Sequence, residues 1–201
     1  GADVGQQEVE DAPVEPAAVD PARDAFVPPE LAGRDEFRDK VRISLARIRA
    51  QDRTAAILEF LSLTNYHYDF GIHVKSLNSI TSVARRKEGD FAMVFTSGIT
   101  PYTTDEASGP TELFIRNYGT RVHHMAFRTE KIEETVSRLK ETGMDFLLDL
   151  VGSEDDGLKQ IFSVPSQNTL VVNEYIHRYG GFDGFFTRSN VEKLTEATTR
   201  Q

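Results

Sequence analysis

The chain has 201 residues, of which 39% are hydrophobic and 27% charged, and it contains no cysteine. This length fits one ordinary domain with enough apolar residues for a core, and the lack of cysteine excludes disulfides, thiolate metal sites and cysteine nucleophiles. No stretch of 18 apolar residues occurs, so we expect no association with a membrane.

The net charge of −9 is concentrated in the first 30 residues, which hold eight acidic residues and one arginine and so carry −7. The remaining residues carry −2 and show no basic stripe, which argues against nucleic-acid binding. The first 30 residues also hold five of the eight prolines and no hydrophobic periodicity. We therefore expect an acidic, Pro/Ala-rich tail over residues 1–35, extended or disordered, followed by a single domain over 36–201. The chain begins at Gly1 without methionine, which fits a cloning remnant or a trimmed N-terminus, so the location stays open between a cytoplasmic protein, slightly favoured, and a trimmed exported protein.

Hydrophobic periodicity predicts a strand, a helix and three more strands in the first half of the domain. Alternation in the first strand places Val41, Ile43 and Leu45 on one apolar face. Asp52 is expected to cap the first helix, and Gly119 to end a second, short helix. In chain order, the predicted elements are a strand at 40–48, a helix at 53–60, strands at 65–77, 79–86 and 90–96, and a helix at 111–117.

The second half repeats the same order of elements. A cap at Thr129 and a stop at Gly143 delimit its helix. The predicted elements are a strand at 121–128, a helix at 130–141, and strands at 144–151, 158–164 and 169–177.

Both halves thus read as a β-α-β-β-β unit, and two such units can cover each other's open sheet faces around a central cavity. The predicted fold class is α+β, with paired βαβββ modules forming a mixed, partly open barrel. Module one spans about 36–109, module two about 120–180, and a C-terminal helix about 188–200. A ferredoxin-like sandwich is the alternative, although it needs two helices for four strands and this chain offers about eight strands.

Two stretches in the second half carry a family resemblance. The first runs from Val122 to Leu147 and begins Val-His-His-Met-Ala-Phe-Arg, and the second runs from Gln160 to Phe186. In order and spacing they resemble the C-terminal catalytic domain of 4-hydroxyphenylpyruvate dioxygenase. That family belongs to the vicinal-oxygen-chelate superfamily, also called the glyoxalase/bleomycin resistance/dioxygenase superfamily. The resemblance covers residues 72–200 and is weaker over 36–71.

The resemblance implies an iron(II) held by two histidines and one glutamate, with open positions for a 2-oxo acid and dioxygen. His124 matches the second histidine and Glu174 matches the glutamate. Lys40 stands where the first histidine is expected. An ammonium group supplies a positive charge but no coordination site, so Lys40 is a candidate for a cation that replaces the metal.

Strand alternation leads to the same pair of residues. His124 shares a face with Ala126, and Glu174 lies on the apolar face of its strand. A carboxylate on an apolar face is costly unless it meets a metal, a cation or several donors. Two hypotheses stay open: a metal site whose third ligand comes from another residue, with His73 a poorly placed candidate, or a buried ion pair between Glu174 and Lys40.

The resemblance further implies that Gln160 donates a hydrogen bond to the substrate and that Phe182 and Phe186 form walls of the pocket. We therefore expect a metal-dependent domain, with Fe(II) or another divalent metal, that acts on a small 2-oxo or aromatic organic acid by oxidative decarboxylation. No residue is assigned as catalytic. The first alternative is a metal-free binding protein that keeps the fold and has lost the first histidine. The second is a non-oxidative, metal-dependent lyase or isomerase of the same superfamily.

A homodimer is a further expectation that follows from the superfamily. The remaining histidines are expected to face outward or to pack within the fold; they are His67, His123 and His177.

Overall fold

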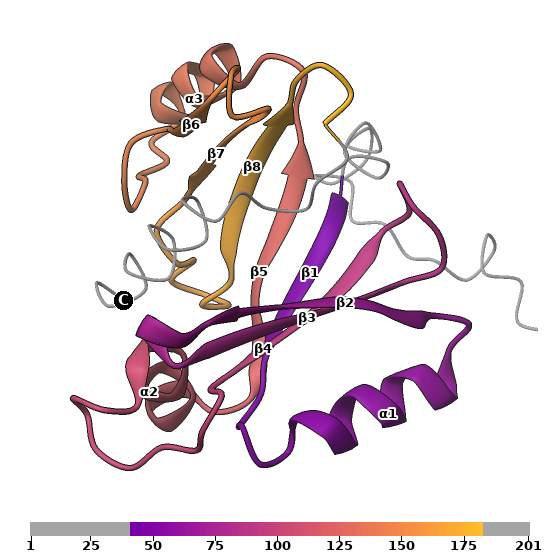
Figure 1. Ribbon diagram of the computed structural model, residues 1–201. Coiled ribbons are helices and arrows are strands. Elements are labelled where there is room, and N and C mark those ends of the chain that lie inside the picture. The colour runs from indigo at the N-terminus through magenta and orange to yellow at the C-terminus, as the bar shows by residue number, and fades with distance from the viewer. Residues whose placement is uncertain (1–40, 183–201) are drawn as a thin grey trace, which may run out of the picture. The chain divides into compact units, whose positions relative to one another are not determined.

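The computed structural model of this chain describes residues 41–182 (Figure 1). The chain divides into two units, Gly1–Asp35 and Glu36–Gln201. The predicted tail over 1–35 and the predicted helix at 188–200 lie outside the described residues, as do Lys40 and Phe186.

The described residues form eight strands, three α-helices and one 3-10 turn in the predicted order. The strands are β1 (Val41–Arg47), β2 (His67–Val74), β3 (Ser79–Arg85), β4 (Ala92–Ser97), β5 (Arg121–Arg128), β6 (Val151–Ser153), β7 (Leu158–Phe162) and β8 (Val172–Arg178). The helices are α1 (Arg53–Leu63), α2 (Gly109–Tyr118) and α3 (Ile132–Glu141), and the 3-10 turn is η3 (Lys75–Leu77).

One mixed sheet contains these eight strands in the order β2-β3-β4-β1-β5-β8-β7-β6. The pairs β1–β4 and β5–β8 are parallel and the other neighbours are antiparallel. Each half therefore has its first strand beside its last, and the antiparallel β1–β5 pair joins the two halves. The predicted α+β fold of paired βαβββ modules is confirmed, and the sheet described here is open at β2 and β6 rather than closed into a barrel.

Helices cover the outer face of the sheet at its two ends, as Figure 1 shows for α1 near β2–β4 and α3 near β6–β8. Under α1, Ile57 packs with Ala84 and Phe95, and under α3, Val136 packs with Ile161. The inner face carries a third apolar cluster, which includes Ile43, Leu45, Val83, Ala92, Val94 and Ala126. The inner cluster spans β1, β3, β4 and β5, so both modules contribute to the interior. None of the helices within residues 41–182 is long and apolar enough to cross a membrane.

Hydrogen bonds from the main chain fix α2 against the ends of β1 and β4. The buried Glu112 carboxylate accepts the N–H groups of Ala50 and Gly98 at 3.0 and 2.8 Å. Gly109 starts the helix with φ +73°, and a Cβ at this position would lie 2.3 Å from the Leu77 carbonyl oxygen. Only glycine fits there without displacing the backbone.

Three local predictions need correction or refinement. Thr129 does not cap α3: the helix starts at Ile132, and the Thr129 hydroxyl lies 2.8 Å from the Thr135 hydroxyl instead. Asp52 does hold the N-cap position of α1, but its side chain makes no capping hydrogen bond. The strand predicted at 144–151 is wrong, because this segment has consecutive apolar residues rather than alternation and forms a single bridge, Phe146 to Ser163, before the short β6.

Candidate ligand and metal site

The strand register brings the predicted site residues onto one face. In the parallel β5–β8 pair, Ala126 lies opposite Glu174, and in the antiparallel β7–β8 pair, Gln160 lies opposite Ile176. Residues directly opposite each other share a face, and so do residues two apart on one strand. His124, Glu174 and Gln160 therefore all lie on the inner face.

His124 and Glu174 are in contact. The Nε2 atom of His124 lies 3.4 Å from Oε2 of Glu174. Glu174 is fully buried, at 0% exposure, and neither of its carboxylate oxygens has a hydrogen-bond partner among residues 41–182. Most buried polar groups in folded proteins are hydrogen-bonded, so two unpartnered carboxylate oxygens are consistent with a group that completes the site.

Burial sets the protonation of this pair. It raises the pKa of Glu174 to about 7, against a partly offsetting charge from Arg178. Burial also lowers the pKa of His124 to about 3, and the positive charge of Arg47 lowers it further. Between these two pKa values both groups are neutral, because the carboxyl keeps its proton and the imidazole takes none. A neutral imidazole is the form that coordinates a metal.

A bulge in β5 adds His123 to the site. Leu45 pairs with His124 but the next residue, Ala46, pairs with Val122, so His123 is an extra residue in the ladder. Simple alternation along a strand puts neighbouring residues on opposite faces, and the bulge removes this alternation for His123 and His124. The Nδ1 atoms of His123 and His124 lie 2.9 Å apart, close enough for one ring to donate to the other.

This hydrogen bond permits the His124 tautomer that can act as a metal ligand. If His124 donates from Nδ1, its Nε2 keeps a free lone pair directed at Glu174, and His123 is the acceptor. The His123 ring is held by an edge-on contact with Phe114, at 4.8 Å between centroids. His123 is thus a packed residue, as expected, and it also orients His124.

Arg47 was missed by the sequence analysis. It follows Ile43 and Leu45 on the inner face of β1, and its guanidinium lies over the Phe114 ring at 4.4 Å. It is only 5% exposed, and burial lowers its pKa to about 9. The sequence did contain a signal for Arg47. It is a charged residue at a position of β1 that alternation assigns to the apolar face, just as Glu174 is on β8, and charged residues are rarely buried.

Gln160 is fully buried, and in the part of the chain that the structure describes neither its amide nitrogen nor its amide oxygen has a hydrogen-bond partner. Phe162, its neighbour on the inner face, contacts His124 edge-on at 5.3 Å between centroids. Phe182 is half-buried at the end of the described chain and lines a cavity of about 320 Å³ together with residues from four strands and a turn.

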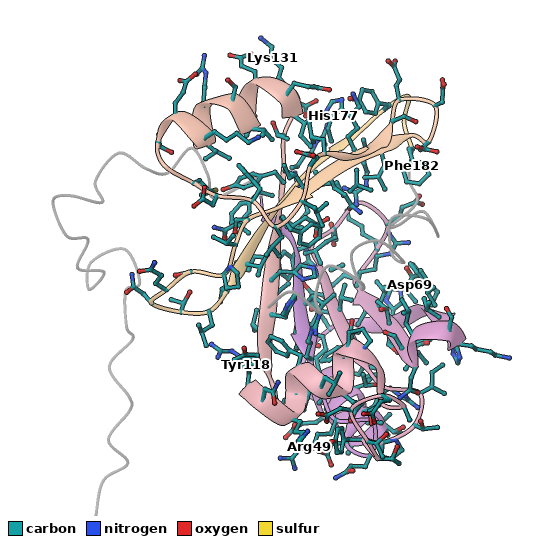
Figure 2. All side chains as sticks on the ribbon, turned by 90° about the vertical axis from the view of Figure 1, so that its left-hand side faces the viewer. Arg49, Asp69, Tyr118, Lys131, His177 and Phe182 are labelled. Carbon is teal, nitrogen blue, oxygen red and sulfur yellow. The ribbon has the colours of Figure 1, made fainter. Side chains whose placement is uncertain are left out.

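The other histidines lie away from this site. His73 is exposed on the edge strand β2, so the suggestion that it supplies a third ligand is wrong. His67 is also exposed, and His177 approaches the Thr129 carbonyl oxygen at 2.7 Å. Figure 2 shows His177 near the α3 end of the molecule.

The donor set fits a divalent cation in part. The neutral imidazole and the unpartnered carboxylate are ligands of the kinds that iron and similar metals take. Within residues 41–182, however, no three His, Cys, Asp or Glu side chains come together as a metal site. The described residues therefore bring together two of the three residues that the family resemblance implies as ligands, His124 and Glu174.

The fold defined by the paired modules is the vicinal-oxygen-chelate fold, and several solved structures share it. A variant of 4-hydroxymandelate synthase from Streptomyces coelicolor matches with a TM-score of 0.65 and 18% identity over 80% of this chain. The match covers 54% of that protein, so this chain spans about half its length.

Two further structures match nearly over their whole length. Methylmalonyl-CoA epimerase from Mycobacterium tuberculosis has a TM-score of 0.54 and 10% identity, covering 70% of this chain and 89% of its own. A hypothetical protein from Bacillus halodurans C-125 has a TM-score of 0.55 and 15% identity, covering 72% and 98%. No protein-family model matches the sequence, and no curated protein does. At these identities the likeness establishes the fold alone.

Proposed function

We propose that this chain binds a divalent cation through His124 and Glu174 and, next to it, a small organic acid. The observation that carries the proposal is the fully buried Glu174 carboxylate, which lies 3.4 Å from the Nε2 atom of His124 and whose oxygens have no hydrogen-bond partner among the described residues. An unpartnered buried carboxylate costs folding free energy, and a bound cation would remove that cost.

The residues around this pair support an acid as the ligand. The buried Arg47 brings a positive charge to the inner face, and Gln160 offers an amide that has no hydrogen-bond partner within residues 41–182. A guanidinium recognises a carboxylate through paired hydrogen bonds. A cation bound at this site would polarise the oxygens of the acid and orient them.

The resemblance to 4-hydroxyphenylpyruvate dioxygenase supports Fe(II) as the cation and a 2-oxo acid as the ligand, with an oxidative reaction. Phe182 and Phe186 are proposed walls for its organic part. The likeness to methylmalonyl-CoA epimerase supports, as a second reaction class, non-oxidative chemistry at the same residues. Oxygen consumption with candidate acids would separate these two reaction classes.

A metal-free binding protein is the alternative function, and two observations favour it. The described residues bring together only two candidate metal ligands, and burial raises the pKa of Glu174 to about 7, so that below this pH the carboxyl is neutral and needs no cation. In such a protein Arg47 would bind the carboxylate directly. If Glu174 is instead ionised, Lys40, which lies outside the described residues, is the proposed cation beside it.

A matched pair of ligands tests the proposal. Phenylpyruvate can chelate a cation through its oxo and carboxylate oxygens, whereas 3-phenylpropionate lacks the oxo group. We expect phenylpyruvate to bind the Fe(II)-loaded, anaerobic protein at least about tenfold more tightly than the EDTA-treated protein, and 3-phenylpropionate to show no such gain. Calorimetry measures both. Equal binding of the two acids with and without iron would replace the proposal by the metal-free alternative, and no binding of either acid would contradict both functions.

The same titration with Glu174→Gln tests whether the gain in phenylpyruvate affinity with iron arises at His124 and Glu174. The amide keeps the shape of the side chain but removes the negative charge, so the gain with iron should disappear. Glu130→Gln is the matched control, because the Glu130 side chain is 70% exposed and pairs with Arg128 at the surface. It should leave the gain with iron intact.

A further inference from the structure

The first strands of the two modules correspond to each other residue by residue. His124 on β5 lies eight residues before the start of α3 at Ile132. Leu45 on β1 lies equally far before the start of α1 at Arg53. The two strands pair antiparallel at the junction of the modules, and in that pair Leu45 lies directly opposite His124. Leu45 is therefore the counterpart of His124 in module one.

The last strands of the modules, β4 and β8, follow the same correspondence. In module two, Glu174 lies opposite the residue two places after His124, in the parallel β5–β8 pair. In module one, Thr96 lies opposite the residue two places after Leu45, in the parallel β1–β4 pair. Thr96 is therefore the counterpart of Glu174. Both candidate ligands thus have a defined equivalent position in the other module.

The two equivalent residues in module one have a different chemistry from His124 and Glu174. Leu45 has no atom that can coordinate a metal, and it is 7% exposed within the apolar cluster of the inner face. The hydroxyl of Thr96 is already hydrogen-bonded to the hydroxyl of Thr81, at 3.3 Å, and both side chains are buried. The interior of module one is therefore satisfied without a cation at these positions, whereas the Glu174 oxygens have no hydrogen-bond partner among the described residues.

Position 45 is well placed for a ligand to the same cation. Residues directly opposite each other in an antiparallel pair share a face, and their Cβ atoms are about 4.5–5.5 Å apart. A side chain at position 45 therefore starts beside His124 and enters the interior on the same side as Glu174, which lies 3.4 Å from the Nε2 atom of His124. A histidine at this position would have its ring next to both groups.

We propose that Leu45, rather than Lys40, occupies the place of the third protein ligand, so that the cation is held by module two alone. The inference rests on the proposed function, because it concerns the cation that His124 and Glu174 bind. A site with two histidines and one carboxylate leaves its other coordination positions open. With leucine in place of one histidine, one more position is open to the organic acid or to water. The acid therefore supplies a larger share of the ligands than it does in a three-residue site.

Restoring the missing ligand tests the assignment. We expect Leu45→His to bind Fe(II) at least about tenfold more tightly than the unmodified protein in anaerobic calorimetry, because the added imidazole is a further metal ligand. Leu45→Phe is the matched control: it also places a ring at this position but has no nitrogen lone pair, so it should bring no gain. Adding Glu174→Gln to Leu45→His should remove the gain, because the new ring and the carboxylate bind the same cation.

A second pair of variants covers the case in which Leu45→His does not fold. Aspartate is smaller than the leucine it replaces and offers a carboxylate, so Leu45→Asp should also raise the affinity for Fe(II). Leu45→Asn is its control, since the amide has nearly the same shape without the negative charge, and its gain should be smaller. Far-UV circular dichroism and melting temperatures verify that each variant is folded.

The outcomes separate this inference from the proposed function. If the unmodified protein binds Fe(II) and neither Leu45→His nor Leu45→Asp binds it more tightly, the assignment of position 45 is overturned and the proposed function stands. If Leu45→His binds Fe(II) and the unmodified protein does not, the assignment stands and the proposed function fails. A gain in Leu45→His that survives the addition of Glu174→Gln overturns the assignment, because the new ring then binds iron elsewhere.

Discussion

Replacing Glu174 by glutamine should stabilise the metal-free protein at alkaline pH and have little effect at acidic pH. The pKa of this carboxyl is raised by burial from 4.5 to about 7. The folded protein therefore keeps a proton between these pH values that the unfolded chain releases. In that window the free energy of unfolding falls as pH rises, and above pH 7 the loss is complete. A shift of this size corresponds to about 3 kcal/mol.

His124 has the opposite influence, because its pKa is lowered from 6.5 to about 3. The unfolded chain binds a proton below pH 6.5 that the folded protein does not take, so the free energy of unfolding falls as pH decreases through this range. The two effects largely cancel between pH 4.5 and 6.5. Stability of the unmodified protein should therefore have a broad maximum there.

The comparison of unmodified protein and variant isolates Glu174, because His124 is present in both. At each pH, the unfolding free energy of the unmodified protein is subtracted from that of Glu174→Gln. We expect this difference to be about 3 kcal/mol larger at pH 8 than at pH 4.5, because only the unmodified protein loses stability as the pH rises. Urea denaturation in EDTA, followed by circular dichroism at several pH values, measures it. A variant that is less stable at pH 8 than at pH 4.5, relative to the unmodified protein, would refute this reasoning. It would show that Glu174 is ionised and paired with a cation of the protein itself, as in the Lys40 hypothesis.

Three more substitutions test other parts of the structure. Gln160→Leu should stabilise the metal-free protein by about 1–2 kcal/mol in urea denaturation, because it removes a fully buried amide without partners, and should weaken binding of the organic acid. His123→Phe should weaken cation affinity about 10- to 100-fold in calorimetry, because it keeps an aromatic ring but removes the Nδ1 atom that is hydrogen-bonded to His124. Gly109→Ala should cost at least about 2 kcal/mol more than Gly143→Ala, because both have positive φ but only Gly109 has backbone within 3 Å of the added Cβ.

Each of these expectations has an outcome that contradicts it. A destabilised Gln160→Leu protein would mean that the amide has a partner within the fold. Unchanged cation affinity in His123→Phe would mean that His124 is oriented by strand packing alone. Equal costs for Gly109→Ala and Gly143→Ala would mean that η3 moves to accept the extra carbon.

Periodicity in the sequence was sufficient for most of the fold. The alternation predicted over 40–48 and 121–128 and the helical spacing predicted over 130–141 correspond to β1, β5 and α3. These three elements each bury one face, so their patterns are strong, whereas α1 buries only Ile57 fully and was indicated by its N-cap position and residue types. The segment 144–150 was mispredicted because its apolar residues are consecutive, and β-propensity without alternation does not specify a strand.

The site was only partly accessible from the sequence. His124 and Glu174 could be placed on the inner face because each lies on a strand with clear alternation. The bulge at His123 could not be foreseen, since it is a mismatch between two strands and no single strand carries a signal for it. The position of Leu45 opposite His124 depends on the pairing of β1 with β5, which no local pattern contains.

The central claim, that His124 and Glu174 bind a divalent cation, is tested most directly by iron content after anaerobic reconstitution with Fe(II) and removal of free metal. The unmodified protein is predicted to retain one iron per chain, and His124→Ala and Glu174→Gln to retain little. Elemental analysis of the three proteins, each verified as folded by circular dichroism, gives the answer. Iron retained equally by all three, or by none, would contradict the claim.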